Sequence, residues 1–582
     1  MVAATRRTGG AGHPDDGAMR PEIERIAALG RTRVVVVGGG INGIATFRDL
    51  ALQGVDVVLV ERDDIAGGAT AASSHMIHGG IRYLENGEFR LVRESVRERN
   101  DLLRTAAHVV RPLETTIPIY STFSGLLSAP LKFLFGRSGR PAERGALLIK
   151  IGLVLYDLYS RGGRVVPRHR FAGRRRTRRE LPELDPAVRY SATYFDAGVA
   201  DPERLAVDVL LDGLRAHPGA HVGTRLAAVG MGSAGVRVRD GQTGREFDIA
   251  ADVVVNATGP WADLTNGALG TPTHLLGGTK GSHIVLDHPE LLAATGGREI
   301  FFEHSDGRIV LVYPLKGRVL VGTTDIEADP REPAACTEDE VDYFIDLVGR
   351  VFPRIVVDRS QIVYRYSGIR PLPRHDGQSA GAVSRDYRVE TTAIADGPLL
   401  LSLIGGKWTT FRALGESLAD RVLAVLGADR VTSTHGRPIG GAVDYPRDAA
   451  AREAWVAREL GDLPAGRAAV LFARYGTRAS EVAERIRAAA PDAPVLDDQL
   501  SAEEIAYLVD VEHVVHLDDL VFRRTDLAFT GRATRDALEQ IGPHLARAAG
   551  WDDLRLDREI EACTDLLRRH GVAPGEEVRP AP

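Results

Sequence analysis

The chain is poor in cysteine, with only Cys336 and Cys563 among its 582 residues. Two cysteines this far apart, without a CxxC neighbour, exclude a disulfide framework and a cysteine zinc site, and they fit the reducing cytoplasm. No run of about 18 apolar residues occurs, so we expect no helix that spans a membrane. Residues 1–30 carry charge and have no apolar h-region, so we expect a flexible tail there rather than a signal peptide.

An excess of positive charge is missing as well. The net charge of -6 gives no electrostatic reason to expect nucleic acid as a partner, although residues 161–179, RGGRVVPRHRFAGRRRTRR, are almost purely cationic. Glycine, in contrast, is abundant: its 63 residues cluster where strands would meet helices. Together with the 44% apolar residues, this predicts a turn-rich α/β protein of two or three domains.

A nucleotide-binding signature occupies residues 31–64, RTRVVVVGGGINGIATFRDLALQGVDVVLVERDD. It predicts a buried strand of four valines, a GxGxxG turn at Gly38, Gly40 and Gly43, a helix and a second strand. The three glycines permit the tight turn, the approach of backbone N–H groups to a pyrophosphate, and the packing of the helix on the sheet. Glu61 closes the second strand, where a carboxylate can bind both hydroxyls of an adenosine ribose. The alternative is a glycine-rich turn in an ordinary α/β domain.

A late strand distinguishes two classes of dinucleotide. Residues 251–263, ADVVVNATGPWAD, form an apolar run that ends in ATG. In flavoproteins with two dinucleotide-binding folds, such a strand returns to the first sheet and closes over the cofactor, whereas a simple NAD dehydrogenase does not need it. The sequence therefore favours FAD. Ser73 and Ser74 can donate to the pyrophosphate or ribityl chain of a flavin, or they can serve as a helix N-cap or polar turn.

Further motifs follow the nucleotide-binding unit in a fixed order: HMIHGGIRYLENGEFRLVRES, NATGPWAD, KGSHIV, VGTTD, YSGIRPL and GGKWTTFR. Together they resemble the FAD-dependent glycerol-3-phosphate dehydrogenases over roughly residues 33–415, and LDDLVFRRTDLAF resembles the helical C-terminal domain of that family. The resemblance implies an α/β flavoprotein with a two-dinucleotide-binding-domain, Rossmann-like fold, a mixed-sheet substrate domain and an all-helical C-terminal domain. We expect FAD-binding and substrate subdomains to interleave over 31–440, helices over 441–575 and a tail over 576–582.

The resemblance also implies a function: oxidation of sn-glycerol 3-phosphate to dihydroxyacetone phosphate by hydride transfer to FAD, with electrons passed to membrane quinone. We then expect a cytoplasmic homodimer, held peripherally at the inner face of the cell membrane, with no metal and no nucleic acid. A glycerol-3-phosphate oxidase that reduces oxygen is one alternative, and a non-catalytic FAD-binding protein of the same fold is another. The joint presence of Arg82, Arg370 and Lys407 argues against the second, since fold alone does not determine function.

A phosphorylated polyol needs cations around its dianion. Arg82, Arg370 and Lys407 lie in glycine-rich or apolar turns, and the resemblance places them, with Tyr83, in the substrate pocket beside the flavin.

Removal of the hydroxyl proton needs a base with a pKa near the working pH. His78 is our first candidate, and His283 and His304 follow, while an arginine such as Arg370 or a water could assist.

Two glycine turns are expected to approach the flavin. Residues 78–80 would lie against the ring, where missing side chains permit close approach of the backbone. Gly405 and Gly406 would direct a helix N-terminus at the N1/O2 edge, together with Lys407. The residues expected to contact the cofactor are Gly38, Gly40, Ile41, Asn42, Gly43, Glu61, Arg62, Thr70, Ser73, Ser74, His78, Gly80, Thr258, Gly259, Gly405, Gly406, Lys407 and Thr409.

Two further segments carry expectations. Residues 87–103, GEFRLVRESVRERNDLL, predict a supporting helix whose mixed charges belong to a solvated face without chemistry. Residues 123–164 combine an apolar segment with basic flanks and precede the arginine cluster. This pattern is typical of an interfacial membrane anchor, or of a buried helix in a cap of the substrate domain with a solvated basic loop.

Overall fold

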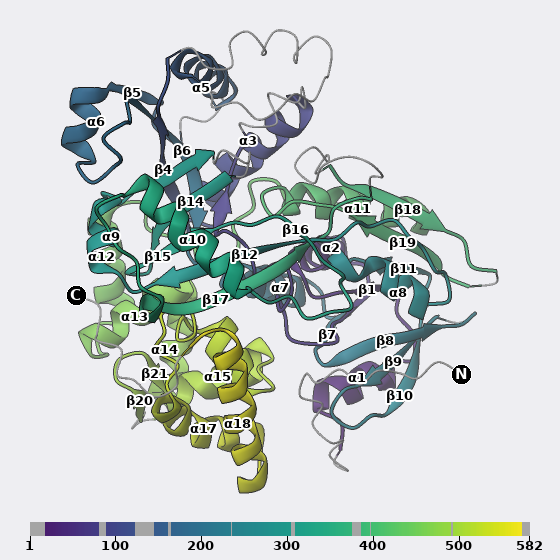
Figure 1. Cartoon of the computed structure of the whole chain (residues 1–582). Coiled ribbons are helices and arrows are strands. Elements are labelled where there is room, and N and C mark those ends of the chain that lie inside the picture. The colour runs from purple at the N-terminus through teal and green to yellow at the C-terminus, as the bar shows by residue number, and fades with distance from the viewer. Residues whose placement is uncertain are drawn as a thin grey trace.

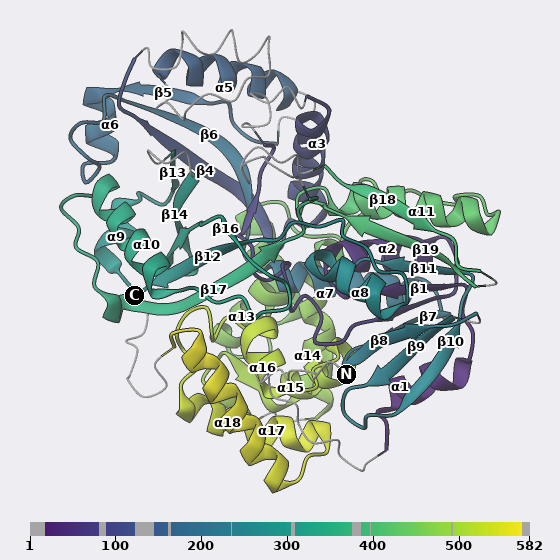
Figure 2. The ribbon, with the colours of Figure 1, turned by 45° about the vertical axis from the view of Figure 1, so that its right-hand side comes forward.

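The computed structural model describes residues 18–80, 89–122, 145–160, 165–233, 235–303, 309–374, 386–395, 397–489 and 493–572. A six-stranded sheet and a ten-stranded sheet form most of the body, and the helical C-terminal domain packs along one side of both (Figures 1 and 2). The predicted architecture is therefore confirmed.

The six-stranded sheet carries the nucleotide-binding unit. Its order is β18-β19-β11-β1-β2-β7, with β18 antiparallel to β19 and the other neighbours parallel. The strands are β1 (Val34–Val37), β2 (Val57–Val60), β7 (Ala220–Gly223), β11 (Val253–Asn256), β18 (Arg388–Thr392) and β19 (Leu399–Ile404). Every residue of β1, β2 and β11 is buried, as expected for parallel strands covered on both faces. The predicted return of the late strand is confirmed, since β11 pairs directly with β1.

Helices and a small sheet cover the two faces of this sheet. On one side, helix α2 (Ile41–Leu52) packs between α7 (Pro202–Ala216) and α11 (Phe411–Leu426). The other side meets a three-stranded antiparallel sheet of β8 (Leu226–Met231), β9 (Gly235–Asp240) and β10 (Glu246–Ala250). The parallel core is thus buried between helices and a second sheet, which leaves its carboxyl edge to build a site.

The expected flexible tail over 1–30 is wrong for its last part. Helix α1 (Pro21–Leu29) buries Ile23 and Ile26 against the same core as β1 and β2. The apolar pair spaced three residues apart falls on one helical face, and Pro21 suits the first turn. The prediction of a tail relied on the charged residues of the segment and did not take this short apolar stripe into account.

The second sheet is mixed. Its path is β16-β12-β15-β14-β13-β4-β6-β3, while β17 pairs with β12 and β5 pairs with β6. Only the β13–β4 pair is parallel among the described ladders of this sheet. The strands are β3 (Met76–Ile77), β4 (Val110–Ile119), β5 (Arg170–Gly173), β6 (Tyr190–Val199), β12 (Thr279–Leu286), β13 (Glu299–Glu303), β14 (Ile309–Leu315), β15 (Arg318–Gly322), β16 (Ile326–Glu327) and β17 (Ile362–Arg370).

The other described helices outside the C-terminal domain are six α-helices and two short 3-10 helices. They are α3 (Phe89–Thr105), α5 (Ala146–Ser160), α6 (Arg174–Glu180), α8 (Ala262–Ala268), α9 (Pro289–Ala294), α10 (Glu338–Val351), η2 (Gly259–Trp261) and η3 (Arg359–Gln361). Helix α5 lies at the outer edge of the molecule in both views, and α6 lies at the same end (Figures 1 and 2).

Where it is described, the C-terminal domain is helical apart from one short β-ladder, β20 (Pro494–Leu496) with β21 (Leu500–Ser501). It has its own apolar core. Its helices, with the turns that lead into them, are η5 (Gly440–Ala442), α12 (Ala449–Glu459), α13 (Ala465–Tyr475), η6 (Gly476–Arg478), α14 (Ala479–Ala488), α15 (Ala502–Glu512), α16 (Leu517–Asp519), the π-helical η7 (Leu520–Arg524), α17 (Arg535–Ala549) and α18 (Asp553–Arg569).

Buried ion pairs join this domain to the nucleotide-binding part. Arg204 of α7 makes two 2.6 Å hydrogen bonds to Glu512, and Arg524 binds both carboxylate oxygens of Asp64 at 2.9 and 3.0 Å. Asp64 lies three residues after Glu61. The C-terminal domain is therefore anchored on the loop that follows β2.

Candidate active site

The glycine turn after β1 is fixed by close backbone contacts. Gly38 has a φ of 113°, and a Cβ there would lie 2.8 Å from the carbonyl oxygen of Ala257, which follows β11. A Cβ on Gly43 would overlap the carbonyl oxygen of Gly38. Both neighbours are backbone atoms and cannot yield, so these positions need glycine. The turn lies where the carboxyl ends of β1 and β11 meet, the usual place for a ligand in such a sheet.

Three distant segments meet at the N-terminus of α2. Gly40 is the N-cap and offers no side chain, while Thr70 accepts a 3.0 Å hydrogen bond from the backbone N–H of Ile41. A Cβ on Gly406 would lie 2.8 Å from the side-chain nitrogen of Asn42. The Asn42 Oδ1 atom is buried and has no hydrogen-bond partner among the described residues. An open helix N-terminus beside an unpaired amide oxygen fits the phosphates and hydroxyls of a dinucleotide.

Glu61 folds back over this turn. Its Oε2 accepts a 2.6 Å hydrogen bond from the Gly39 N–H, and its Oε1 accepts one of 2.8 Å from the Asp63 N–H. Burial, and then the negative charge of Asp63, raise the pKa of Glu61, while these two bonds favour the charged form. A carboxylate has about four lone-pair sites, so two bonds leave acceptors for ribose hydroxyls.

Trp261 is not among the residues predicted to contact the cofactor, yet it packs against one of them, Arg62. The guanidinium of Arg62 lies 4.6 Å from the centre of the Trp261 ring, and the indole N–H donates to the Pro330 carbonyl oxygen at 2.8 Å. Trp261 belongs to the NATGPWAD motif, and its position directly after ATG was the available signal. At the start of this motif's turn, the Thr258 hydroxyl donates to Asn256 at 2.7 Å and Gly259 has a φ of 60°.

Two neighbouring strands carry one predicted substrate residue, Arg370 on β17, and one candidate base, His283 on β12. In the antiparallel β12–β17 pair, Arg370 lies opposite Thr279, and Tyr366 lies opposite His283. Arg370 and Tyr366 are four positions apart on β17, and Thr279 and His283 are four positions apart on β12. Because alternate residues of a strand point to the same side, all four side chains face one side of the sheet. The register thus places Arg370 and His283 on one surface, although 87 positions of numbering separate the two residues.

Arg370 is held in place. Its guanidinium donates to Asp325 at 3.0 Å, to the Thr323 hydroxyl at 3.1 Å and to the Thr324 carbonyl oxygen at 3.0 Å. A Cβ on Gly281 would overlap this guanidinium. Arg370 was expected in a turn, but it ends strand β17, where its side chain, 21% exposed, forms an ion pair with Asp325.

His283 is buried against the loop that follows the nucleotide unit. Its Nε2 lies 2.8 Å from the Ser74 hydroxyl, and its ring stacks on Tyr366 with centres 4.8 Å apart. Burial, and then the positive charge of Arg370, hold the pKa of His283 well below its usual value. The Tyr366 hydroxyl donates to the Ser73 carbonyl oxygen at 2.7 Å, so residues 70–74 lie over this face. Ser74, expected to contact the flavin chain, thus bonds to His283 here.

The two glycine turns lie together. The Thr409 hydroxyl donates to the His78 carbonyl oxygen at 3.3 Å. Lys407, two positions before Thr409, is buried. Gly80 has a φ of 76°, and Gly405 and Gly406 have φ angles of 84° and 107°. Left-handed backbone explains the glycines at these positions.

Three predicted residues cannot be placed. Arg82, Tyr83 and His304 lie outside the described residues.

The expected solvated face of α3 is present at the exposed residues Arg90, Arg93, Arg97 and Arg104, but other charged side chains of the helix are buried. Glu98 and Arg99 are 2% and 0% exposed, and Glu98 accepts two 2.7 Å hydrogen bonds from Arg412 of α11. Charge spacing alone fits a surface helix, but here partners from distant segments neutralise the charges.

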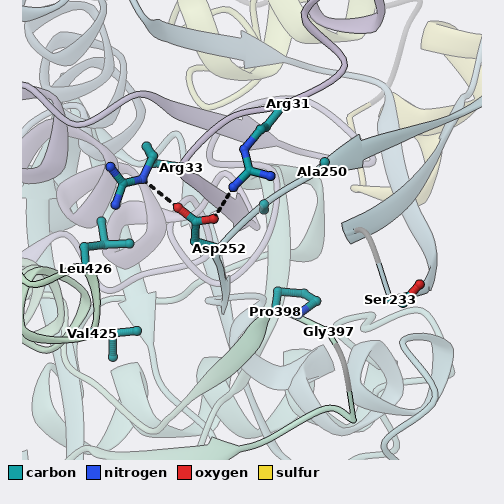
Figure 3. Close-up of a pocket in the computed structure, with 10 residues that line it drawn as sticks. Arg31, Arg33, Ser233, Ala250, Asp252, Gly397, Pro398, Val425 and Leu426 are labelled. Atoms are coloured by element: carbon teal, nitrogen blue, oxygen red, sulfur yellow. Dashed lines mark hydrogen bonds and ion pairs between the residues drawn. The ribbon is translucent and has the colours of Figure 1, made fainter.

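One surface pocket lies at the other end of the first sheet (Figure 3). Arg33 binds Asp252 at 2.6 Å, and Arg31 binds the same carboxylate. These residues precede β1 and β11, whereas ligands of such sheets bind at the carboxyl ends of the strands. This pocket is therefore separate from the nucleotide-binding turn.

Known protein families and relatives match most of the chain. The family described as FAD dependent oxidoreductase matches residues 33–420, and the C-terminal domain of alpha-glycerophosphate oxidase matches 432–556. A glycerol-3-phosphate dehydrogenase of Synechocystis sp. is 33% identical over 579 residues, which cover 95% of this chain and 98% of that protein. The D-erythritol 1-phosphate dehydrogenase of Brucella abortus is 32% identical over 506 residues, with 84% and 93% covered.

A solved structure shows the same fold. The glycerol-3-phosphate dehydrogenase from Bacillus halodurans complexed with FAD superposes with a TM-score of 0.71 at 20% identity. The superposition covers 96% of this chain and 99% of that one. The helical C-terminal domain is thus part of a shared architecture.

Proposed function

The chain belongs to the FAD-dependent glycerol-3-phosphate dehydrogenase family, and from this premise we propose that it oxidises sn-glycerol 3-phosphate to dihydroxyacetone phosphate. The observation that carries the proposal is that Arg370 and His283 face the same side of the β12–β17 pair. That face lies against residues 70–74, which continue from the nucleotide-binding unit. A candidate cation for a phosphate and a candidate base for a hydroxyl on one face, beside the loop expected to contact the cofactor, support the proposal.

The residues that would hold FAD fit the group. The open N-terminus of α2, from Gly40 to Gly43, suits the pyrophosphate, and Glu61 suits the ribose. The glycine turns at 78–80 and 405–406 suit the flavin ring, because they leave room for the backbone to approach it. When bound, FAD accepts the electron pair released at C2 of the substrate.

Arg370 and Lys407 would bind the substrate phosphate. Arg370 is fixed by three acceptors, and Lys407 is 9% exposed, so both cations act in a partly dry environment. Charge-assisted hydrogen bonds are strongest there. Arg82 and Tyr83 stay predictions at this pocket.

The geometry favours His283 over His78 as the base. An imidazole whose Nε2 donates to Ser74 leaves Nδ1 to take the proton, and Nδ1 is buried without a partner among the described residues. Burial and the charge of Arg370 keep the ring neutral and able to accept a proton, although its lowered pKa departs from the near-neutral value expected of a general base.

Substrate choice tests this proposal. The assay compares kcat/KM for sn-glycerol 3-phosphate, D-erythritol 1-phosphate and glycerol with a soluble quinone as acceptor. We expect sn-glycerol 3-phosphate to be preferred and unphosphorylated glycerol to be nearly inert. A higher kcat/KM for D-erythritol 1-phosphate would replace the proposed substrate with a longer polyol phosphate.

We also propose that α5 docks on the membrane surface and that membrane quinone takes the electrons. Several apolar side chains of α5 are 37–49% exposed, namely Leu147, Ile151, Val154, Leu155, Leu158 and Tyr159. The arginines of α6 lie at the same end of the molecule (Figures 1 and 2). Apolar residues beside cations are typical of interfacial helices. Among the described residues, no helix is long and apolar enough to cross a membrane.

Vesicle flotation and acceptor kinetics test this part. The double variant Ile151→Glu and Leu158→Glu should lose binding to anionic vesicles, whereas Val431→Glu, at a position that is 77% exposed elsewhere, should keep it. Equal binding of both variants would contradict docking through α5.

Faster re-oxidation of the reduced protein by oxygen than by quinone would make it an oxidase. The homodimer stays a prediction, which sedimentation analysis would check.

A further inference from the structure

Three buried side chains meet beneath the glycine turn 78–80. Arg99 of α3, Tyr156 of α5 and Asp196 of β6 are 0%, 2% and 1% exposed. The Arg99 guanidinium donates at 2.9 Å to both the Tyr156 hydroxyl and the Asp196 carboxylate. The Tyr156 hydroxyl in turn donates to the same carboxylate oxygen. Three elements from different parts of the chain are thus joined at one point.

This cluster ends on the backbone of the turn. The Gly79 N–H lies 3.0 Å from the Tyr156 hydroxyl oxygen and 3.0 Å from the carboxylate of Asp196. A Cβ on Gly79 would overlap the Tyr156 hydroxyl. The turn therefore rests directly on the cluster, and the glycine is required by contact with a side chain.

The chemistry of the cluster specifies geometry better than an apolar core would. Burying an ion pair brings little net stability compared with apolar packing. The planar guanidinium, the carboxylate and the phenol can satisfy one another in few arrangements. Burial raises the pKa of Tyr156 well above its ordinary value, so its hydroxyl keeps its proton. The position of Gly79 is thus defined by directional bonds.

A neighbouring contact ties the same helix to the second flavin turn. Glu98, adjacent to Arg99, binds Arg412 of α11, the helix that begins after Gly405 and Gly406. Helix α3 consequently connects to both turns, which also touch each other through the bond from Thr409.

We propose that Arg99, Tyr156 and Asp196 are positioning residues that set the place of the turn 78–80 at the flavin. The inference rests on the proposed function, because it takes this turn to face the cofactor. None of the three touches the reacting atoms; they act through the backbone of Gly79. No sequence signal marks them as a set, since 97 positions separate Arg99 from Asp196.

Tyr156→Phe is the decisive variant, because it removes only the hydroxyl. We expect FAD content and KM for sn-glycerol 3-phosphate to stay near wild type, while kcat falls roughly ten- to a hundred-fold as the turn shifts. The visible circular dichroism of the bound FAD should change as well. The matched control is Tyr507→Phe of α15, whose buried hydroxyl has no hydrogen-bond partner among the described residues. This variant should change neither kcat nor the visible circular dichroism.

Arg99→Lys provides a second test, since it keeps the charge but lacks the planar fork that reaches Tyr156 and Asp196 together. The same two changes are expected. A Tyr156→Phe protein with wild-type kcat and wild-type circular dichroism overturns the inference. The inference is also overturned if Tyr156→Phe and Tyr507→Phe lose FAD equally and this loss accounts for the fall in kcat. If sn-glycerol 3-phosphate fails to reduce the wild type, the proposed function fails, whereas the circular dichroism still tests the positioning.

Discussion

Glu340 offers the most quantitative prediction, because it joins helix α10 to strand β12 behind the candidate active site. Its side chain is 3% exposed and accepts 2.7 Å hydrogen bonds from Lys280, Ser282 and Thr324. The Thr337 N–H adds a bond of 2.9 Å. Lys280 and Ser282 belong to the KGSHIV motif, whose alternate residues face the site. This carboxylate therefore supports the strand that carries the candidate base.

The pKa of Glu340 gives the magnitude. Burial disfavours the charge, but hydrogen bonds from Lys280, the Thr337 N–H, Thr324 and Ser282 outweigh it and lower the pKa from 4.5 to about 2. The difference corresponds to roughly 3 kcal/mol of folding free energy. Because the folded-state pKa is the lower one, this stability is present above pH 4.5 and is lost as the pH falls from 4.5 towards 2.

Glu340→Gln keeps the shape and removes the charge. We expect the free energy of unfolding at pH 7 to fall by about 3 kcal/mol, measured as a lower urea midpoint at unchanged slope, and the acid loss between pH 4.5 and 2 to shrink. The control is Glu338→Gln in the same helical turn, whose ion pairs to Arg359 and Arg365 involve a 61% exposed carboxylate and contribute less than about 1 kcal/mol. Equal midpoints for wild type and Glu340→Gln, or equal losses in both variants, would refute the reasoning.

Three further predictions follow from single contacts. Gly43→Ala places a Cβ on a backbone carbonyl oxygen and should purify without FAD, measured by the ratio of flavin to protein absorbance, whereas Gly152→Ala, with open space around its Cβ, should stay yellow. Asp64→Asn removes the carboxylate that both Arg523 and Arg524 bind and leaves Arg524 with the longer 3.6 Å ion pair to Glu512, so it should cost about 3–5 kcal/mol in urea unfolding and weaken FAD binding, measured by titration of the apoprotein; unchanged stability and FAD affinity would contradict the anchoring role. The low pKa of His283 predicts a flavin reduction rate that is flat above pH 6.5 and falls only in acid as the ring takes a proton; a rise in rate on acidification would exclude it as the base.

The nucleotide half could be predicted because its determinants are local. Gly38, Gly43 and Glu61 lie in one βαβ unit, and the spacing of about twenty residues brings the acid back to the turn. The late strand could also be predicted from the sequence, because a continuous apolar run such as Val253–Asn256 is typical of a parallel strand buried on both faces.

The remainder depends on partners far along the chain. Glu98 is buried because Arg412, 314 residues away, neutralises it, and no pattern within α3 shows this. The choice between histidines depends on the register of β12 with β17, which brings His283 beside Arg370. Motif proximity alone favoured His78. Long-range pairing of this kind has no local signal in one sequence.

Anaerobic mixing of the purified protein with sn-glycerol 3-phosphate, followed by the flavin absorbance band, tests the central claim most directly. We predict rapid bleaching of the wild type, and bleaching roughly a hundred-fold slower or more in His283→Gln with FAD still bound. The control His221→Gln, on strand β7 of the nucleotide-binding sheet, should bleach like the wild type. A yellow wild-type protein that does not bleach, or a His283→Gln protein that bleaches at the wild-type rate, would contradict the account.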